Sequence, residues 1–181
     1  MIERLNILFV DSRNVFRSIL AESLANKLVK TSGFKGILNF DSCGISAING
    51  YRVHPDLKRL AQELNFELSR NYARNFFDVA LESFDLIFVF EHWHKSKVES
   101  VYLEEGAQPD MVFYVGSFVS LENVLWPSKT GIAAKLSWLK IIDLPSHEIL
   151  TPLSDFYEEK LKTAKIIQQA VRNLLYFFAR R

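Results

Sequence analysis

The chain has 181 residues, enough for one domain that buries about two-thirds of the surface its unfolded form exposes. Its 22 Lys and Arg nearly balance its 21 Asp and Glu, which indicates neither a nucleic-acid partner nor a membrane-binding surface. The single cysteine, Cys43, excludes an intrachain disulfide and fits a reducing compartment. With no long apolar run near the N-terminus or elsewhere, we expect a cytoplasmic protein without a signal peptide or transmembrane helix.

The first half of the chain alternates strand and helix patterns. Residues 4–10 form a short, almost continuous apolar run that predicts a buried parallel strand. Apolar residues then recur at helical spacing over 16–29, and residues 37–43 predict a second strand. Pro55 stands where a further helix is expected to begin. The order indicates that the chain opens with a βαβ unit.

The second half continues the alternation. Residues 84–90 give the strongest strand pattern, followed by a helix predicted over 92–102 and a strand over 111–115. A long amphipathic helix is predicted from Tyr157 towards the C-terminus. Between them, residues 117–142 show no clear periodicity, and their two tryptophans, Trp126 and Trp138, favour a packed insertion.

This alternation predicts a single α/β domain over residues 1–181, a flavodoxin-like doubly wound parallel sheet flanked by helices, with an insertion at about 117–142. Ligands of such sheets bind beyond the carboxyl ends of the strands. The loop after the first strand, Asp11 to Arg17, is therefore the first candidate site.

The loop between the first strand and the first helix has the composition of an anion cradle. Its backbone N–H groups can turn inward at the helix N-terminus, and Arg17 can add a guanidinium contact to a phosphate. Asn14 and Ser18 can hold the loop by hydrogen bonds to its backbone. An ordinary strand-to-helix turn capped by polar residues is the alternative interpretation.

The same segment resembles the low-molecular-weight protein tyrosine phosphatases, and the arsenate reductases that share their fold. These families carry a cysteine, five residues and then Arg-Ser after a strand, with an asparagine inside the loop and Ala-Glu in the helix. The matching positions here are Asn14, Arg17, Ser18, Ala21 and Glu22. Further similarities lie downstream, at Ser42-Cys43-Gly44, Gly50, Pro55, Arg74, Phe84 to Ile87, Glu91 and His94.

The departures from the family pattern concern the chemistry. Asp11 stands at the position of the nucleophilic cysteine, Arg13 at a loop glycine and Ile19 at the proline after Arg-Ser. The family's general acid is the aspartate of an Asp-Pro pair near the C-terminus. Asp143, in Ile142-Asp143-Leu144-Pro145, is the counterpart that the sequence suggests, with its proline displaced by one residue.

The resemblance implies a phosphate-binding loop in which Arg17 would bind phosphate and the remaining loop positions would shape the cradle: Ser12, Arg13, Asn14, Val15, Phe16 and Ser18. A carboxylate at Asp11 is a poorer nucleophile than a thiolate and repels phosphate. We therefore predict a catalytically inactive pseudophosphatase that binds phosphate or phosphotyrosine weakly and acts through a protein partner. No cofactor, metal, nucleic acid or membrane is expected to take part.

Two active alternatives remain open at this stage. The chain is a working aryl phosphatase if Asp11 replaces a native cysteine by engineering. It forms an aspartyl-phosphate if Asp11 itself attacks phosphorus, although phosphatases of that type carry a second aspartate two residues later, where this chain has Arg13. Arsenate reduction is disfavoured because it needs several cysteines and the chain has one.

Overall fold

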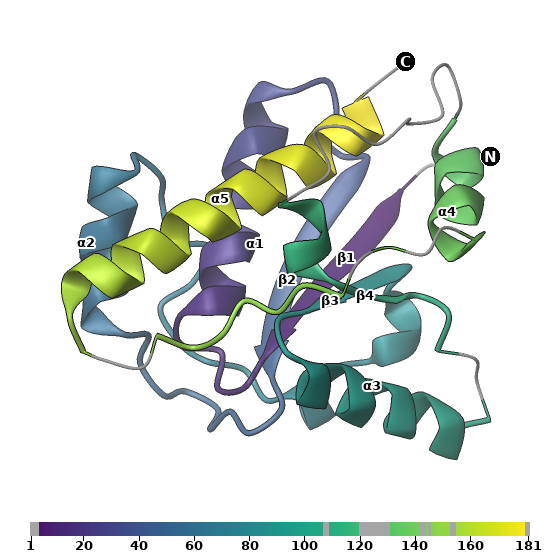
Figure 1. Cartoon of the computed structure of the whole chain (residues 1–181), viewed down its shortest axis with the longest axis horizontal. Helices are drawn as coiled ribbons and strands as arrows, with labels where there is room; N and C mark the ends of the chain where they lie inside the picture. The colour runs from purple at the N-terminus through teal and green to yellow at the C-terminus, as the bar shows by residue number, and fades with distance from the viewer. Residues whose placement is uncertain are drawn as a thin grey trace.

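The computed structural model describes residues 4–106, 109–119, 131–141, 144, 146–152 and 155–179. Four parallel strands form one sheet in the order β2-β1-β3-β4 (Figure 1). They are β1 (Leu5–Asp11), β2 (Leu38–Gly44), β3 (Leu86–Val89) and β4 (Val112–Tyr114). The predicted α/β class and the flavodoxin-like strand order are confirmed.

Helices cover both faces of this sheet (Figure 1). One face packs against α1 (Arg17–Thr31), α2 (Pro55–Glu63), α4 (Ile132–Ile141) and α5 (Tyr157–Ala179), and the other face packs against α3 (His92–Glu104). Short 3₁₀ turns lie at Phe76–Asp78, Leu81–Ser83 and Val115–Phe118. Each helix predicted from the apolar periodicity is present, with ends that differ by a few residues.

The central strand shows why its sequence is almost continuously apolar. Ile7 and Phe9 face the layer of α1 and α5, whereas Leu8 and Val10 face the layer of α3. A strand buried on both faces needs apolar residues at every position. The abundance of phenylalanine follows from the same burial, because six Phe side chains are fully enclosed: Phe9, Phe76, Phe88, Phe90, Phe118 and Phe177.

Helix α4 lies within the segment predicted to be an insertion. Trp138 contacts the Phe177 ring of α5, with 5.6 Å between ring centroids, while Trp126 lies outside the described residues. Lys135 is buried and its Nζ donates to the Phe178 carbonyl oxygen at 2.8 Å, which satisfies an acceptor at the end of α5. The helix escaped prediction because its apolar residues are spread around its whole circumference.

No helix in the described ranges is long and apolar enough to cross a membrane. The organisation as one domain over residues 1–181 stays a prediction.

Candidate functional site

The candidate loop lies where β1 ends and α1 begins, at the carboxyl edge of the sheet. Asp11 is the last residue of β1 and Arg17 the first of α1. Gly44 at the end of β2 lets this loop pack closely, because a Cβ there would lie 2.6 Å from backbone atoms of Arg13 and Asn14. The Asp11 and Ser12 carbonyl oxygens accept backbone N–H groups of residues 45 and 46 at 2.9 and 2.7 Å. The loop is thus held rigidly against β2.

The Asp11 carboxylate points into the loop and occupies its backbone donors. Oδ1 accepts the Asn14 backbone N–H at 2.5 Å, and Oδ2 accepts the Ser18 backbone N–H at 3.1 Å. Asp11 is only 3% exposed. Hydrogen bonds from backbone amides to an ionised carboxylate are among the stronger kind in proteins. The two donors are therefore satisfied by the chain's own anion.

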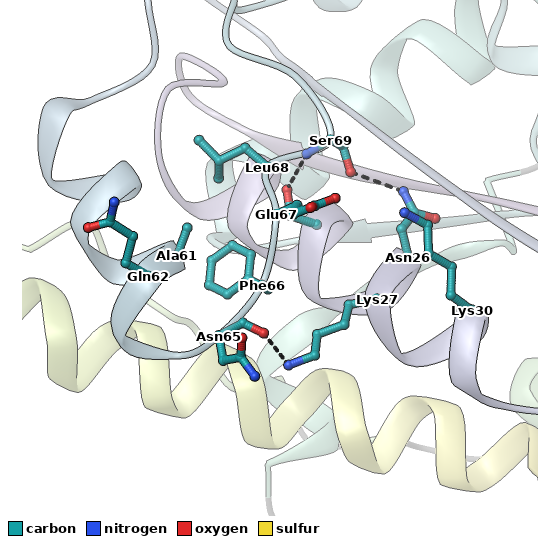
Figure 2. Close-up of a pocket in the computed structure, with 11 residues that line it drawn as sticks. Asn26, Lys27, Lys30, Ala61, Gln62, Asn65, Phe66, Glu67, Leu68 and Ser69 are labelled. Carbon is teal, nitrogen blue, oxygen red and sulfur yellow. Dashed lines mark hydrogen bonds between the residues drawn. The ribbon is translucent and has the colours of Figure 1, made fainter.

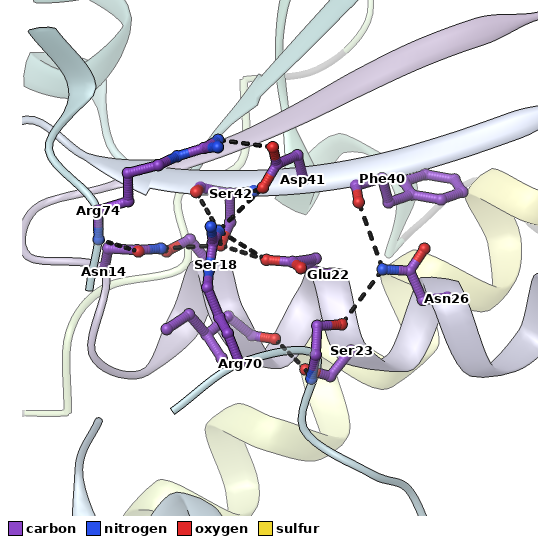
Figure 3. Close-up of polar contacts among 12 residues, drawn as sticks. Asn14, Ser18, Glu22, Ser23, Asn26, Phe40, Asp41, Ser42, Arg70 and Arg74 are labelled. Atoms are coloured by element: carbon purple, nitrogen blue, oxygen red, sulfur yellow. Dashed lines mark hydrogen bonds and ion pairs between the residues drawn. The ribbon is translucent and has the colours of Figure 1, made fainter. Parts of the chain in front are cut away.

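Asn14 fixes the shape of the loop from inside. Its φ of 52° is left-handed, a conformation that asparagine tolerates better than most residues. The buried side-chain amide donates to Ser18 Oγ and Ser42 Oγ, both at 2.8 Å, and Oδ1 accepts the Arg74 backbone N–H at 2.8 Å (Figure 3). Asn14 thus joins β1, α1, β2 and the segment before β3.

Arg17 is buried, and its guanidinium is engaged by protein groups. Nη1 forms an ion pair with Glu91 Oε1 and donates to the Ile149 carbonyl oxygen at 2.7 Å. Nη2 donates to Ser12 Oγ at 3.2 Å. Burial by itself would raise the pKa of Glu91, but the Arg17 charge outweighs it and holds that pKa below its ordinary value. Glu91 is therefore ionised at neutral pH and competes with any anion for Arg17.

His94 lies beneath the loop in a defined tautomer. Its Nδ1 accepts the Glu91 backbone N–H at 3.1 Å, so the ring proton is on Nε2, 3.0 Å from Ser12 Oγ. Burial and the neighbouring Arg17 charge lower the His94 pKa to about 4. The ring is therefore neutral at physiological pH, and the Ser12 oxygen accepts from both His94 and Arg17.

We expect His94 to stay neutral down to a pH of about 4–5, with Nε2 protonated, because its charged form is disfavoured by burial. Nitrogen-15 NMR of the imidazole ring checks this, with His94→Gln assigning the signals. Since the unfolded chain takes up this proton near pH 6.5, the folded state loses stability as pH falls from about 6.5 towards 4. A titration midpoint near 6.5 would contradict the burial argument.

The segment 146–152 returns to the loop and forms its outer wall. The Ile149 backbone N–H donates to the Phe90 carbonyl oxygen at 2.8 Å, and Thr151 Oγ1 lies 3.4 Å from Glu91 Oε1. Gly116 permits this path, because a Cβ there would lie 2.1 Å from the His147 carbonyl oxygen. Thr151 was not among the site residues predicted from the sequence, although the dipeptide Thr151-Pro152 before the last helix is visible there.

A cavity of about 250 Å³ opens over the loop between these elements. Its lining comes from the loop, from the residue before α2, from the returning segment and from the start of α5 with the residues before it: Asp11, Ser12, Arg13, Val15, Phe16, Arg17, His54, Thr151, Pro152, Asp155 and Lys160. Asp143, the general-acid position suggested by the sequence, lies outside the described residues. Within the described part of the chain, Thr151 and Pro152 line the cavity mouth.

Lys160 closes the far side of this cavity. Its Nζ pairs with Asp56 at 2.8 Å and with Asp155 at 3.4 Å, and lies 3.3 Å from His54 Nε2. Burial opposes the charged amine, but these carboxylates outweigh it and raise the Lys160 pKa. The lysine therefore joins α5 to the start of α2.

The other loop positions differ in exposure. Arg13 is exposed, and its φ is not left-handed, so the backbone at this position does not require glycine. Val15 is half-buried, and Phe16 is buried with its ring edge-on to His54. Cys43 is fully buried in the layer of α3, and burial raises its thiol pKa, so it behaves as a core residue.

A network of charges supports the loop from behind (Figure 3). Glu22 is buried in α1 and accepts hydrogen bonds from Ser42 Oγ at 2.7 Å and from Arg70 Nη2 at 2.8 Å. Arg70 also pairs with Asp41 at 3.0 Å, and Asp41 pairs with Arg74 at 2.7 Å. Burial raises the Glu22 pKa, and the Arg70 charge opposes that shift. The network was not predicted from the sequence because its partners are far apart along the chain.

A second cleft, of about 510 Å³, lies away from the loop, between α1 and the segment after α2 (Figure 2). Lys27 crosses it to the Asn65 carbonyl oxygen, and Asn26 Nδ2 donates to Ser69 Oγ at 3.2 Å. Its mixed polar lining includes no pair of carboxylates or nucleophile–base pair. The loop after β1 therefore remains the candidate site.

A four-stranded parallel sheet, with a strand–loop–helix turn at its carboxyl edge and a buried arginine at the start of that helix, defines an α/β protein of flavodoxin-like topology. The sequence profile of the low molecular weight phosphotyrosine protein phosphatases matches residues 6–134. The chain belongs to this family. No curated protein matches it by sequence.

Solved structures agree on the fold at low sequence identity. The low molecular weight protein tyrosine phosphatase from T. tengcongensis superimposes with a TM-score of 0.71 at 21% identity, covering 95% of this chain and 98% of that chain. The YwlE arginine phosphatase from Geobacillus stearothermophilus superimposes with a TM-score of 0.68 at 17% identity, covering 95% of this chain and 91% of that chain. Vibrio vulnificus Wzb, solved in complex with benzylphosphonate, superimposes with a TM-score of 0.70 at 16% identity, covering 95% of this chain and 97% of that chain.

Proposed function

We propose that this family member is a pseudophosphatase that binds a protein partner and does not hydrolyse phosphate esters. The observation that carries the proposal is the Asp11 carboxylate, which accepts the loop amides of Asn14 and Ser18. In the family pattern these donors would cradle a phosphate, and the residue at the Asp11 position would attack it. Here the cradle is closed by an internal anion.

Electrostatics support a low affinity for phosphate. A unit charge about 4 Å from Asp11 is repelled by roughly 4 kcal/mol at an effective dielectric near 20, and a dianion by about twice that. Arg17 offers one positive charge, which Glu91 already neutralises. The loop therefore lacks the net positive charge that a phosphate dianion needs.

The chemistry required for turnover is also missing from the mouth of the cavity. We propose that Thr151-Pro152, which lines the cavity, stands in place of the family's Asp-Pro pair. A threonine hydroxyl has no proton acidic enough to protonate a leaving phenolate near neutral pH. An aspartyl-phosphate route is unfavourable as well, because both Asp11 oxygens are held by the loop and exposed Arg13 takes the place of a second aspartate.

Inorganic phosphate binding tests the closed loop directly. We expect no calorimetric heat for the native chain at millimolar phosphate, and at least about tenfold tighter binding by Asp11→Ser, which frees two loop donors and removes the repelling charge. The native chain should also leave phenyl phosphate unhydrolysed.

The matched control is Asp85→Ser. Asp85 also accepts a backbone amide, that of Asn6 at 2.7 Å, but it lies just before β3, at the opposite edge of the sheet. The Asp85→Ser substitution should therefore leave phosphate binding unchanged. Turnover by the native chain, or phosphate binding equal to that of Asp11→Ser, would sink the proposal.

A further inference from the structure

A groove of about 990 Å³ lies beside the loop, on its outer side. It is continuous with the cavity over the loop, because Arg13, Val15 and His54 line both. The remaining lining comes from the turn before α2, from α2 itself and from the segment before β3: Gly50, Tyr51, Arg52, Val53, Pro55, Lys58, Asn71 and Tyr72. We call this surface the basic groove.

The exposed charged side chains that line the basic groove are all positive. Arg13, Arg52 and Lys58 are exposed, and no carboxylate of the described residues lines the groove. Within the ranges that the structure describes, none of these three cations forms an ion pair. The chain as a whole carries a formal charge of only +1, so this positive charge is a local feature.

Aromatic side chains stand among these cations. Tyr51 is 62% exposed and Tyr72 is 50% exposed, although both are large enough to gain from burial. Arg52 and Tyr72 face each other across an antiparallel bridge, so the segments of the groove wall are held together by backbone pairing. The wall is thus a fixed surface that offers cations and aromatic faces together. Tyrosine and arginine are the residue types enriched at the energetic centres of protein interfaces.

We propose that the basic groove binds an acidic peptide segment of a partner protein, with carboxylates opposite Arg13, Arg52 and Lys58 and an apolar or aromatic side chain against Tyr51 and Tyr72. The inference rests on the proposed function, since a loop closed by Asp11 leaves recognition to the surface beside it. The near-zero net charge favours a peptide over a nucleic acid, which binds longer basic stripes.

The test uses fluorescence anisotropy with a fluorescein-labelled peptide that alternates glutamate pairs with tyrosine, and a matched peptide with glutamine in place of glutamate. We expect the acidic peptide to bind and the neutral peptide to bind at least about tenfold more weakly. Arg52→Ala combined with Lys58→Ala should weaken binding by about fivefold, and raised salt should weaken it further. The control pair is Lys30→Ala with Lys35→Ala, exposed cations outside the groove.

Three outcomes would overturn the inference: equal binding of the neutral peptide, an equal loss in the control pair, or tighter binding of single-stranded oligonucleotide than of the acidic peptide. Its failure is separable from failure of the proposed function. Phosphate-ester turnover by the native chain refutes the pseudophosphatase while leaving peptide binding to be scored on its own. If the native chain is inactive and also fails to bind the peptide, the proposed role of the basic groove is refuted and the proposed pseudophosphatase function still stands.

Discussion

Asp11→Cys combined with Thr151→Asp should hydrolyse phenyl phosphate about 10²–10⁴-fold faster than Asp11→Cys alone. The cysteine supplies the nucleophile that the family mechanism needs, and the loop amides of Asn14 and Ser18 then face a thiolate. The aspartate at the cavity mouth supplies the proton for a leaving phenolate, whose pKa of about 10 makes unassisted departure slow. Initial rates at saturating substrate check the ratio.

The matched control for the acid is Thr151→Asn on the Asp11→Cys background. Asparagine has nearly the shape of aspartate but carries no titratable proton, so it should give no gain. The advantage of aspartate over asparagine should shrink with p-nitrophenyl phosphate, whose leaving group departs without protonation. Equal rates for the two variants on phenyl phosphate would show that Thr151 is not the acid position.

Glu91 sets a second condition on restored activity. Because its carboxylate pairs with Arg17, the guanidinium must exchange one anion for another when phosphate enters. Glu91→Gln on the same background should therefore lower KM for phenyl phosphate more than it changes kcat, since it removes competition in the ground state and transition state alike.

The sequence could predict the elements on either side of the loop because their signals are local. A continuous apolar run predicts β1, a helical period predicts α1, and the polar residues between them lie in the loop where expected. The closure of the loop by Asp11 also follows from proximity, since its amide partners are three and seven residues away. Local sequence spacing was therefore sufficient to predict the geometry of this half of the site.

The outer half of the site depends on contacts that spacing does not reveal. Ile149 meets Arg17 across 132 residues, and Thr151 meets Glu91 across 60. Asp143 stays a prediction from the sequence because it lies outside the described residues, and among the described residues a Thr-Pro pair lines the cavity. The ion pair between Arg70 and Glu22 was not predicted either, because a buried ion pair leaves no periodic pattern in the sequence.

Arg70→Met should lower the free energy of unfolding by about 3 kcal/mol. Removing one partner of a buried ion pair leaves the other charge uncompensated, which costs roughly 3–5 kcal/mol. We expect the lower end of this energy range because the Arg70 side chain is 23% exposed, whereas that of Glu22 is 7% exposed. Urea unfolding at pH 7 measures the loss, and Arg74→Met, whose partner Asp41 is 33% exposed, should cost less than about 1 kcal/mol.

The loss in Arg70→Met should depend on pH in a direction that identifies Glu22. Burial raises the Glu22 pKa in the folded chain, and removing the Arg70 charge raises it further. A raised folded pKa means that the folded state binds the proton more readily, so stability is lost as pH rises from the unfolded pKa through the folded pKa and is regained as pH falls back below the folded pKa. The difference in free energy of unfolding between the native chain and Arg70→Met should therefore become smaller as the pH is lowered from 8 to 5. A difference that stays constant over this range would locate the cost in lost packing of Arg70 and not in the buried carboxylate.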